Sequence, residues 1–439
     1  MIKRILFFFL VALSFNVVKA QDINKPKLDS LLDVLAANNK TMGSLTISKD
    51  GKVVYQRSVG YSSVEAKTLA DAHTKYRIGS ISKIFTGVII FQLVEEKKLT
   101  LDATLDKFYP QMPNASKITI AQLLSHRSGL FNLTNEPEFG TYMTRPQTHE
   151  FLLSKMAALK PDFAPSEKFK YSNTNFILLS YIAEKITGKA YPEIVKQRVI
   201  NKIGLKDTYY GGKINAAANE ALSYDYNDGW KVAVETDMSI PTGAGAMVST
   251  PADLDKFIEA LFAGKLISAA SLAQMKPTIE GYGMAMHKSA FKDKVGYGHG
   301  GAIDGFLSSL QYFPEDKLAV CYIKNGGSYT PENIITGALS IYFNQPYAIP
   351  SFKSIALKTE DLDKYLGVYA SPTFPLKITV SKDGATLIGQ ATGQGSLRLE
   401  AKEGDRFLFE PAGIEMVFYP EKHQFLLKQG GREVLFTKE

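Results

Sequence analysis

The sequence contains very little cysteine: one residue among 439. A single cysteine cannot form an intramolecular disulfide, nor can it supply the clustered thiolates of a structural zinc site. The chain also lacks a His-Glu-x-x-His run, the usual ligand pattern of zinc peptidases. Cys321 lies in the apolar run 318–323 and is predicted to be a buried strand residue. We therefore expect a fold stabilised by its hydrophobic core, with no metal or organic cofactor.

Several other signatures are missing. There is no Gly-x-Ser-x-Gly elbow, which excludes the usual α/β-hydrolase site, and no Gly-x-Gly-x-x-Gly in a βαβ setting, which argues against nucleotide binding. The sequence shows no internal repeat and no low-complexity segment. The formal charge is +7, but the basic residues are scattered rather than clustered, so no nucleic acid partner is expected.

What the N-terminus does contain is a short basic start followed by apolar residues. Lys3 and Arg4 precede the apolar stretch 5–18, and Ala20 provides a small residue at the expected cleavage point. This pattern predicts a secretory signal peptide over residues 1–20, too short for a stable membrane span. The mature protein is expected to be exported, to the periplasm or to the medium.

Residues 21–350 alternate between helical and strand patterns, as expected for one large mixed domain. Predicted helices span residues 25–38, 82–96, 119–125, 175–186 and 251–263. Predicted strands span residues 43–48 and 52–60, and two more occupy 297–323 around a turn at 313–316. Thr250 is expected to cap the helix at Pro251, with Asp253 completing a capping box. The stretch 132–165 reads as a long connection that carries helices over a cleft.

The character of the sequence changes after about Pro350. Short alternating strands with turns at 382–384, 403–405 and 429–431 predict a small all-β domain over residues 351–439. The fold class expected for the whole chain is thus α/β (α+β). It comprises a helix-flanked antiparallel sheet with a mostly helical lobe and a C-terminal β-rich domain.

Ser80 and Lys83 are the first candidates for chemistry. A spacing of three residues places both side chains on one face of a helix, and the free N–H groups of a helix start can stabilise an oxyanion. Burial among apolar neighbours would lower the pKa of Lys83 and make it a proton acceptor. The alternative is that Ser80 caps the helix and Lys83 is solvated. The same spacing recurs at Ser289 and Lys292, so alone it decides little.

Tyr171 and Asn173 directly precede another predicted apolar helix. A tyrosine near a cationic lysine can act as a general base and then return the proton to a leaving group. Asn173 could hold Lys83 and bond a substrate amide. In the ordinary alternative, Asn173 caps the following helix and Tyr171 is packing. Tyr342 and Asn344 repeat the spacing.

The run His299-Gly300-Gly301-Ala302 is the third candidate and contains the one His-x-Gly in the sequence. Two glycines in a predicted strand remove side chains where a ligand or another backbone must come close. The run therefore suits a strand edge along which a substrate lies, with the Ala302 amide as an oxyanion donor. The alternative is a bulge or turn with a surface histidine. The other five histidines are scattered, and each is expected to be structural or exposed.

Taken in order, Ser80-x-x-Lys83, Tyr171-x-Asn173 and His299-Gly300-Gly301 resemble the three motifs of the serine β-lactamase and penicillin-binding-protein superfamily. The most similar branch is that of the class C β-lactamases and their esterase and D-amino-acid peptidase relatives. The strings at 123–130 and 245–254 support the resemblance, which covers roughly residues 25 to 345.

The resemblance implies a role for each motif. Ser80 would be acylated, Lys83 and Tyr171 would share the proton transfers, and Asn173 would orient the substrate. Ala302, directly after the third motif, would form the oxyanion hole with Ser80 through the two backbone amides. Gly301 would let the substrate approach.

One departure bears on the substrate. The third motif of a β-lactamase usually begins with lysine, whose charge helps to hold the β-lactam carboxylate, whereas this chain has His299, neutral at pH 7 by its ordinary pKa. The resemblance therefore implies an exported serine hydrolase for D-amino-acid-containing peptides, cell-wall peptides included, or small esters, of esterase, D-aminopeptidase or D-Ala-D-Ala carboxypeptidase type. The alternatives are a β-lactamase and a non-catalytic sensor that binds penicillin.

Overall fold

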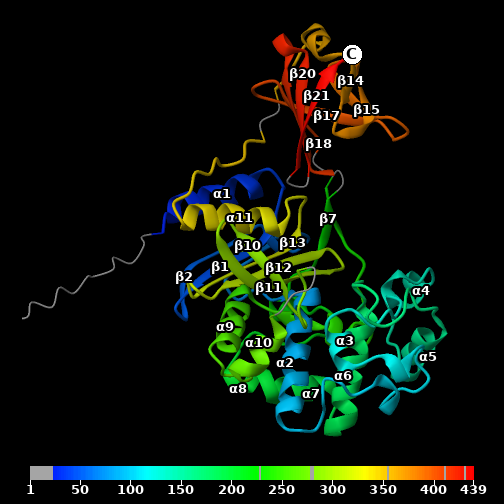
Figure 1. Ribbon diagram of the computed structural model, residues 1–439. Coiled ribbons are helices and arrows are strands. Elements are labelled where there is room, and N and C mark those ends of the chain that lie inside the picture. Colours follow the sequence, from blue (N-terminus) through cyan, green and yellow to red (C-terminus); the bar gives the residue numbers. More distant parts are fainter. Residues whose placement is uncertain (1–22, 227–228, 277–280, 353–354, 410–411, 430–431) are drawn as a thin grey trace, which may run out of the picture.

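A computed structural model describes residues 23–226, 229–276, 281–352, 355–409, 412–429 and 432–439 (Figure 1). The predicted signal peptide and the glycines of the last predicted turn lie outside these ranges. The described chain has a mixed α/β body followed by a C-terminal all-β barrel, which confirms the predicted fold class. None of the described helices is both long and apolar enough to cross a membrane.

The core of the body is a six-stranded antiparallel sheet in the order β10-β11-β12-β13-β1-β2. Its strands are β1 (Met42–Lys49), β2 (Lys52–Val59), β10 (His287–Phe291), β11 (Lys294–Ile303), β12 (Phe306–Phe313) and β13 (Leu318–Gly326). The N-terminal hairpin β1–β2 therefore joins strands from late in the sequence, with Leu45 opposite Tyr322. Three-residue or shorter strands surround this sheet: β3 (Tyr61–Ser63), β4 (Thr68–Leu69), β5 (Tyr76–Arg77), β6 (Tyr209–Tyr210), β7 (Tyr224–Tyr226), β8 (Trp230–Val232) and β9 (Met247–Ser249).

One prediction for this sheet was wrong, because residues 297–323 form parts of three strands rather than two. Ile303 pairs with Phe306, so Asp304 and Gly305 make a two-residue hairpin between β11 and β12. Asp304 takes a left-handed conformation, with φ of +52°, which aspartate tolerates better than most residues. An Asp-Gly pair between apolar residues was the available signal for this turn.

Helices cover both faces of the sheet. The α-helices of the described chain are α1 (Lys25–Ala37), α2 (Ser82–Glu95), α3 (Ile120–Leu124), α4 (Phe139–Tyr142), α5 (His149–Ala158), α6 (Asn173–Thr187), α7 (Tyr191–Val195), α8 (Asn201–Ile203), α9 (Pro251–Phe262), α10 (Ala269–Met275) and α11 (Pro331–Tyr342). Helices α1 and α11 pack on one face and α9 on the other, as Figure 1 shows. Other helices form a lobe to one side of the sheet, where Figure 1 shows α4 and α5. Because both faces are covered, β13 is buried along its whole length, and Cys321 is a buried strand residue as predicted.

The predicted helix positions agree with the structure to within two residues at the starts and ends. Thr119 caps α3 in a capping box with Gln122. The capping box expected for α9 is only half formed. Thr250 accepts from the Asp253 amide at 3.3 Å, but the Asp253 carboxylate instead accepts from the Asp207 amide at 2.8 Å.

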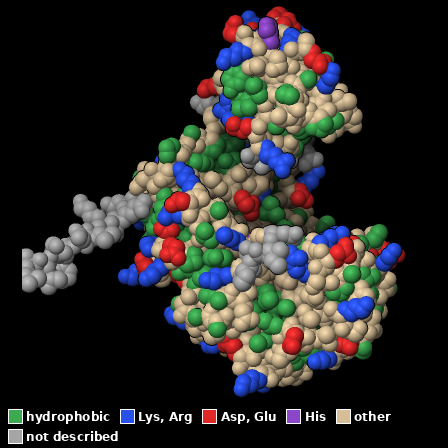
Figure 2. All heavy atoms as spheres, viewed as in Figure 1, with side chains coloured by type: hydrophobic (Ala, Val, Ile, Leu, Met, Phe, Trp, Pro, Cys, Tyr) green, Lys and Arg blue, Asp and Glu red, His purple; other side chains and the backbone are tan. Residues whose placement is uncertain are grey.

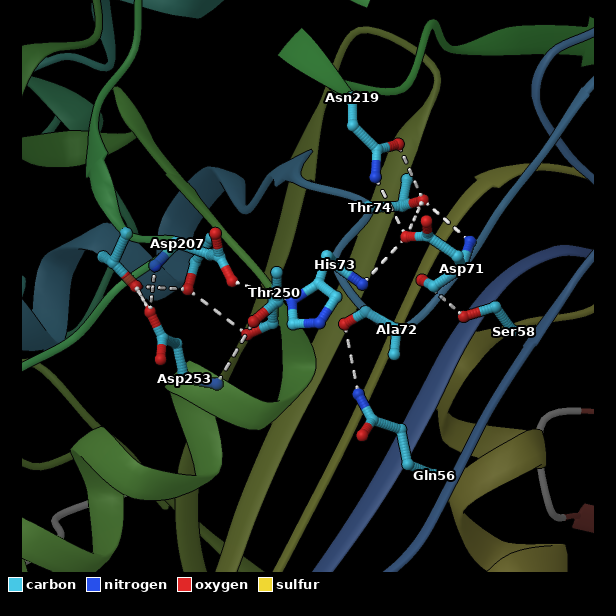
Figure 3. A network of polar contacts seen from close by, with 12 residues as sticks. Gln56, Ser58, Asp71, Ala72, His73, Thr74, Asp207, Asn219, Thr250 and Asp253 are labelled. Atoms are coloured by element: carbon cyan, nitrogen blue, oxygen red, sulfur yellow. Dashed lines mark hydrogen bonds and ion pairs between the residues drawn. The ribbon is translucent and has the colours of Figure 1, made fainter.

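Figure 3 shows that this cap belongs to a polar network that fixes the segment leading to Ser80. The Asp71 carboxylate accepts from the His73 amide at 2.8 Å and from Asn219 Nδ2 at 2.9 Å. The Ser58 hydroxyl on β2 donates to the Asp71 carbonyl at 2.7 Å. His73 Nδ1 lies 3.3 Å from the Asp207 carboxylate, so the network reaches the start of α9. The chain thus enters the candidate site from a fixed position.

The C-terminal strands close into a barrel in sequence order, with β14 paired to β21. The strands are β14 (Gly367–Ser371), β15 (Phe374–Asp383), β16 (Thr386–Ala391), β17 (Leu397–Lys402), β18 (Arg406–Phe409), β19 (Ile414–Tyr419), β20 (Gln424–Gln429) and β21 (Arg432–Lys438). Inward-facing aromatic residues such as Phe407, Phe425 and Phe436 fill the interior. Closure removes the edge strands that an open sheet of this size would expose. In Figure 1 the barrel stands at one end of the molecule, beyond α1 and α11.

On the face shown in Figure 2, basic and acidic side chains are interspersed over the body and the barrel. Among the described residues, no group of three or more His, Cys, Asp and Glu side chains is placed to hold a metal ion.

Candidate active site

Ser80 lies in a single 3₁₀ turn, Gly79–Ile81, that leads directly into α2. It does not cap the α-helix, since Ile81 occupies the cap position and no side chain bonds there. Gly79 has φ of +50°, and a Cβ at this position would lie 2.7 Å from the Ala302 amide nitrogen. Glycine is therefore required, because it lets the turn touch strand β11.

Lys83 is fully buried, and its amine contacts three oxygen atoms. Nζ lies 2.8 Å from Ser80 Oγ, 2.8 Å from Asn173 Oδ1 and 2.7 Å from the Ala244 carbonyl oxygen. Burial lowers the pKa of Lys83 well below its ordinary value, since no carboxylate compensates for the lost hydration. Sequence reasoning missed Ala244, although the supporting string at 245–254 begins at the next residue.

Tyr171 approaches the same serine from the start of α6. Its hydroxyl lies 2.7 Å from Ser80 Oγ, and Lys83 Nζ stands 4.9 Å from the centre of its ring. Burial raises the pKa of Tyr171, and the hydrogen bond to Ser80 offsets only part of that effect. A buried tyrosine with a raised pKa stays protonated, so Tyr171 does not act as the predicted general base before substrate binds.

Asn173 is the first residue of α6, two residues earlier than the predicted helix start, and Ser172 is at the cap position. The Asn173 side chain donates to Thr134 Oγ1 at 3.1 Å and accepts from Lys83. Its backbone amide donates to Asn132 Oδ1 at 2.9 Å. Asn173 therefore holds Lys83, as one of its two predicted roles requires, and does not cap a helix.

The two glycines of the third motif have different surroundings. A Cβ on Gly301 would lie 2.1 Å from the Ile78 carbonyl oxygen and 2.3 Å from Ser308 Oγ. Gly301 therefore makes room for protein atoms, and the Ser308 hydroxyl fixes this contact by donating to Ile78 at 2.9 Å. A Cβ on Gly300 would meet nothing closer than 3.6 Å. The role that was predicted for Gly301, leaving room for a substrate, thus suits Gly300 better.

The predicted residues line one cleft, with a volume of about 430 Å³. Its walls include Ser80, Tyr171, Asn173, His287, His299, Gly300, Gly301, Ala302, Leu307, Ser308, Pro331 and Glu332. Lys83 lies behind Ser80 and contacts it from the buried side. A larger cavity, about 1120 Å³, lies beside α9 and contains none of the predicted site residues.

Two of the histidines that appeared scattered in the sequence, His126 and His287, converge with His299 beside this cleft. The His299 ring lies 4.5 Å from the His287 ring, and its Nε2 lies 3.2 Å from the Tyr282 hydroxyl. The His126 ring is 4.3 Å from the ring of Tyr171 and 4.8 Å from that of Tyr282. Burial lowers the pKa of all three, so they are neutral at pH 7.

His126 also anchors the segment that carries Tyr171. Its Nδ1 lies 3.2 Å from the Ser172 amide nitrogen and 3.2 Å from Asn175 Nδ2. Because both partners are donors, Nδ1 is unprotonated and Nε2 carries the hydrogen. His126 was predicted to be structural or exposed; it is fully buried and in contact with the candidate proton-transfer group. Its place in the string 123–130 was the available signal.

We expect His126→Leu to lower kcat by about 10–100-fold with little change in KM, because Tyr171 loses its position relative to Ser80. His126→Asn keeps an acceptor near the place of Nδ1 and is expected to recover much of that loss. Steady-state kinetics on an ester substrate, with thermal unfolding as the control for stability, test this. Equal kcat values for the two variants would show that His126 only fills space.

Comparison with known proteins agrees with this geometry. The family model described as Beta-lactamase matches residues 29–339. The chain is 25% identical over 450 residues to Penicillin-binding protein 4* of Bacillus subtilis (strain 168), covering 93% of this chain and 98% of that protein. It is 26% identical over 307 residues to Protein flp of Staphylococcus aureus (strain MRSA252), covering 66% of this chain and 60% of that protein.

Two solved structures extend the comparison. The D-amino acid amidase from Ochrobactrum anthropi SV3, complexed with L-phenylalanine amide, has a TM-score of 0.66 and 26% identity, covering 73% of this chain and 98% of its own. The octameric penicillin-binding protein homologue from Pyrococcus abyssi has a TM-score of 0.69 and 25% identity, covering 94% of this chain and 100% of its own. With the family model spanning most of the body and the Ser80–Lys83–Tyr171 contacts at its centre, the chain belongs to the Beta-lactamase family of serine hydrolases.

Proposed function

We propose that this protein is an exported hydrolase that forms an acyl-enzyme on Ser80 with esters or amides of D-amino acids. The observation that carries the proposal is the pair of contacts to one hydroxyl: Lys83 Nζ at 2.8 Å and Tyr171 Oη at 2.7 Å from Ser80 Oγ. A serine hydroxyl is a weak nucleophile until a neighbouring group accepts its proton, and these two contacts supply that arrangement.

Lys83 is the better proton acceptor of the two. A neutral amine has two hydrogens and one lone pair. When Lys83 donates to Asn173 Oδ1 and the Ala244 carbonyl, its lone pair is left to take the proton of Ser80 Oγ, which lies 2.8 Å from Nζ. As Ser80 Oγ attacks the substrate carbonyl carbon, its proton moves to Lys83 Nζ. The lowered pKa of Lys83 provides the neutral form that this step requires.

Tyr171 acts in the second half of the step. Its protonated hydroxyl faces Ser80 Oγ and can pass a proton to the departing oxygen or nitrogen, and Lys83 then restores that proton. The amides of Ser80 and Ala302 are the proposed oxyanion donors, since Gly79 and Gly301 bring the turn and the strand into contact. Water then attacks the carbonyl carbon of the ester that joins the acyl group to Ser80. The acid product leaves, and Ser80 Oγ regains a proton that comes from the water.

The proposed substrate class has two supports. The D-amino acid amidase among the similar structures is named for amides of D-amino acids, and it aligns with most of the body of this chain. The neutral His299, in place of the usual lysine, favours such substrates over β-lactams. Export rests on the signal-peptide pattern of residues 1–20.

Ser80→Ala is expected to abolish labelling by a fluorescent phosphonate, whereas Ser289→Ala, the same change at the repeat of the sequence spacing, leaves labelling unchanged. Ser289 lies on β10 and is absent from the cleft walls, which makes it a matched control. The measurement is in-gel fluorescence with the purified protein. Equal labelling of wild type and Ser80→Ala, or of neither, would overturn the nucleophile assignment. A penicillin adduct that persists for hours by intact mass would instead favour the sensor alternative.

A further inference from the structure

One acidic side chain, and no lysine or arginine that the structure describes, lines the cleft around Ser80. Among the described residues that line the cleft, His287 and His299 are neutral and the rest, apart from Glu332, are uncharged. Glu332 lies in the first turn of α11, directly after Pro331. It is exposed, and its Oε1 lies 3.9 Å from the place where a Cβ of Gly300 would stand.

No basic side chain among the described residues neutralises this carboxylate by an ion pair within 4.0 Å. Lys324 on β13 interacts electrostatically with Glu332, but the Lys324 amine donates its hydrogen bonds to the backbone carbonyls of Gly327 and Tyr329. Burial also lowers the pKa of Lys324 to about 8, and Glu332 opposes that effect only in part. The negative charge of Glu332 therefore remains directed at the cleft and at solvent.

The position of Glu332 along β11 indicates which part of a substrate meets it. Gly300 lies two residues before Ala302, the proposed oxyanion donor, and directly after His299. His299 occupies the motif position whose lysine, in β-lactamases, helps to hold the carboxylate of the substrate. In a β-lactam that carboxylate is attached beside the leaving nitrogen. The leaving-group side of this cleft thus has a neutral imidazole and an anion where a carboxylate would require a cation.

We propose that Glu332 determines substrate choice by charge: the enzyme accepts uncharged or cationic leaving groups and rejects leaving groups that carry a carboxylate. This inference rests on the proposed acyl-enzyme function and narrows its substrate class. Amides and esters of D-amino acids fit it, whereas peptides that end in a free D-alanine carboxylate do not. A like charge desolvated in the same cleft raises the cost of binding, and an opposite charge lowers it.

A helix-stabilising role is the ordinary alternative for an acid in a first turn. The cap of α11 does not need Glu332, because Thr330 accepts from the Asn333 amide at 3.3 Å. Glu150 offers a matched control: it is another exposed glutamate in the first turn of a helix, α5, and it does not line the cleft.

Three thioesters of N-acetyl-D-alanine test the inference, with thioglycolate, mercaptoacetamide and thiocholine as anionic, neutral and cationic leaving groups. Hydrolysis of each thioester releases a free thiol, so one thiol-reactive chromogenic reagent measures all three rates. For wild type we expect kcat/KM to increase from thioglycolate to mercaptoacetamide to thiocholine. Glu332→Gln is expected to raise the thioglycolate rate and lower the thiocholine rate by about 3–10-fold each, with the neutral thioester within twofold. Glu332→Lys is expected to reverse the order, and Glu150→Gln to preserve it.

The outcomes separate the two proposals. If wild type hydrolyses none of the thioesters faster than Ser80→Ala, the proposed function is wrong, and this inference is wrong with it. If wild type hydrolyses them without a charge order, or Glu332→Gln changes all three rates equally, the role of Glu332 is wrong and the acyl-enzyme stands. The differences in kcat/KM among the three thioesters are also expected to become smaller in 1 M salt, where the Debye length is about 3 Å.

Discussion

Replacing Lys83 by arginine is expected to lower kcat/KM for an ester substrate by about 10³-fold, while the protein stays folded. Arginine carries a positive charge and does not release its proton in the accessible pH range, so it cannot accept the proton of Ser80. The effect of a lost general base is commonly 10²–10⁴-fold. Pre-steady-state release of the leaving group measures the acylation step directly. Lys292→Arg, at the repeat of the spacing on the protein surface, is the matched control and is expected to leave the rate unchanged.

The pH profile of the wild-type enzyme provides the second measurement for the same prediction. Activity needs neutral Lys83, whose pKa burial lowers, so kcat/KM is expected to rise with pH and reach its plateau well below 10.5, the ordinary lysine value. Activity also needs protonated Tyr171, whose pKa burial raises, so the plateau is expected to extend beyond pH 10.0, the ordinary tyrosine value. A profile that rises only near pH 10 would contradict the assignment of Lys83 as a neutral base. So would a Lys83→Arg variant that is as active as wild type.

Of the substitutions proposed for this protein, removal of the Arg77 guanidinium is expected to lower the free energy of unfolding the most. The Arg77 side chain is 2% exposed and contacts Asp304 Oδ2 at 2.7 Å and Glu235 Oε1 at 2.6 Å. It also donates to the carbonyls of Gly212 and Thr236, each at 2.8 Å. One side chain therefore joins β5, the 212–236 segment and the hairpin between β11 and β12.

We expect Arg77→Met to lower the free energy of unfolding by about 3–5 kcal/mol, because it leaves the fully buried Asp304 carboxylate without its cation. Urea unfolding followed by fluorescence is a suitable measurement, since Trp230 is the one tryptophan and lies within the 212–236 segment. The double variant Arg77→Met/Asp304→Asn is expected to lose less than Arg77→Met alone, because the buried Asp304 charge is removed together with its cation while the acceptor for the Thr236 amide is kept. A loss below about 1 kcal/mol, or additive losses in the double variant, would contradict this account.

This cluster also matters for catalysis. Arg77 lies three residues before Ser80, and Asp304 lies two residues after Ala302. The ion pair therefore ties together the two backbone segments that carry the proposed oxyanion donors. Ser308 adds a second tie between the same segments through its bond to Ile78. Neither Arg77 nor Ser308 stands in a motif that the sequence analysis used.

Much of the fold could be predicted from local patterns. A long, strongly apolar run placed the buried helix α2, and cap residues such as Thr119 and Thr250 located helix starts. These features depend on neighbours within a few residues, which the sequence displays directly. The third strand at 297–323 was missed because the Asp304-Gly305 turn that separates β11 from β12 was not recognised.

The candidate site divides in the same way. Ser80, Lys83, Tyr171, Asn173 and the run 299–302 could be selected as an ordered set of short motifs. The structure brings all of them to the walls of one cleft except Lys83, which contacts Ser80 from the buried side. The burial of Lys83 and its lowered pKa could be anticipated from its apolar neighbours, whereas the burial of Tyr171 depends on packing between distant segments. The lowered pKa of Lys83 and the raised pKa of Tyr171 both arise from burial.

What the sequence by itself determined is the family of chemistry: a serine with a lysine one helical turn away, a tyrosine–asparagine pair and a glycine-rich strand. Only the tertiary structure decided how that chemistry is tuned. It gathered His126, His287 and His299 around Tyr171 and Tyr282, and it placed Glu332 beside Gly300. The physical reason is that electrostatic energies depend on distance and hydration in space, and residues far apart in the chain meet only after folding.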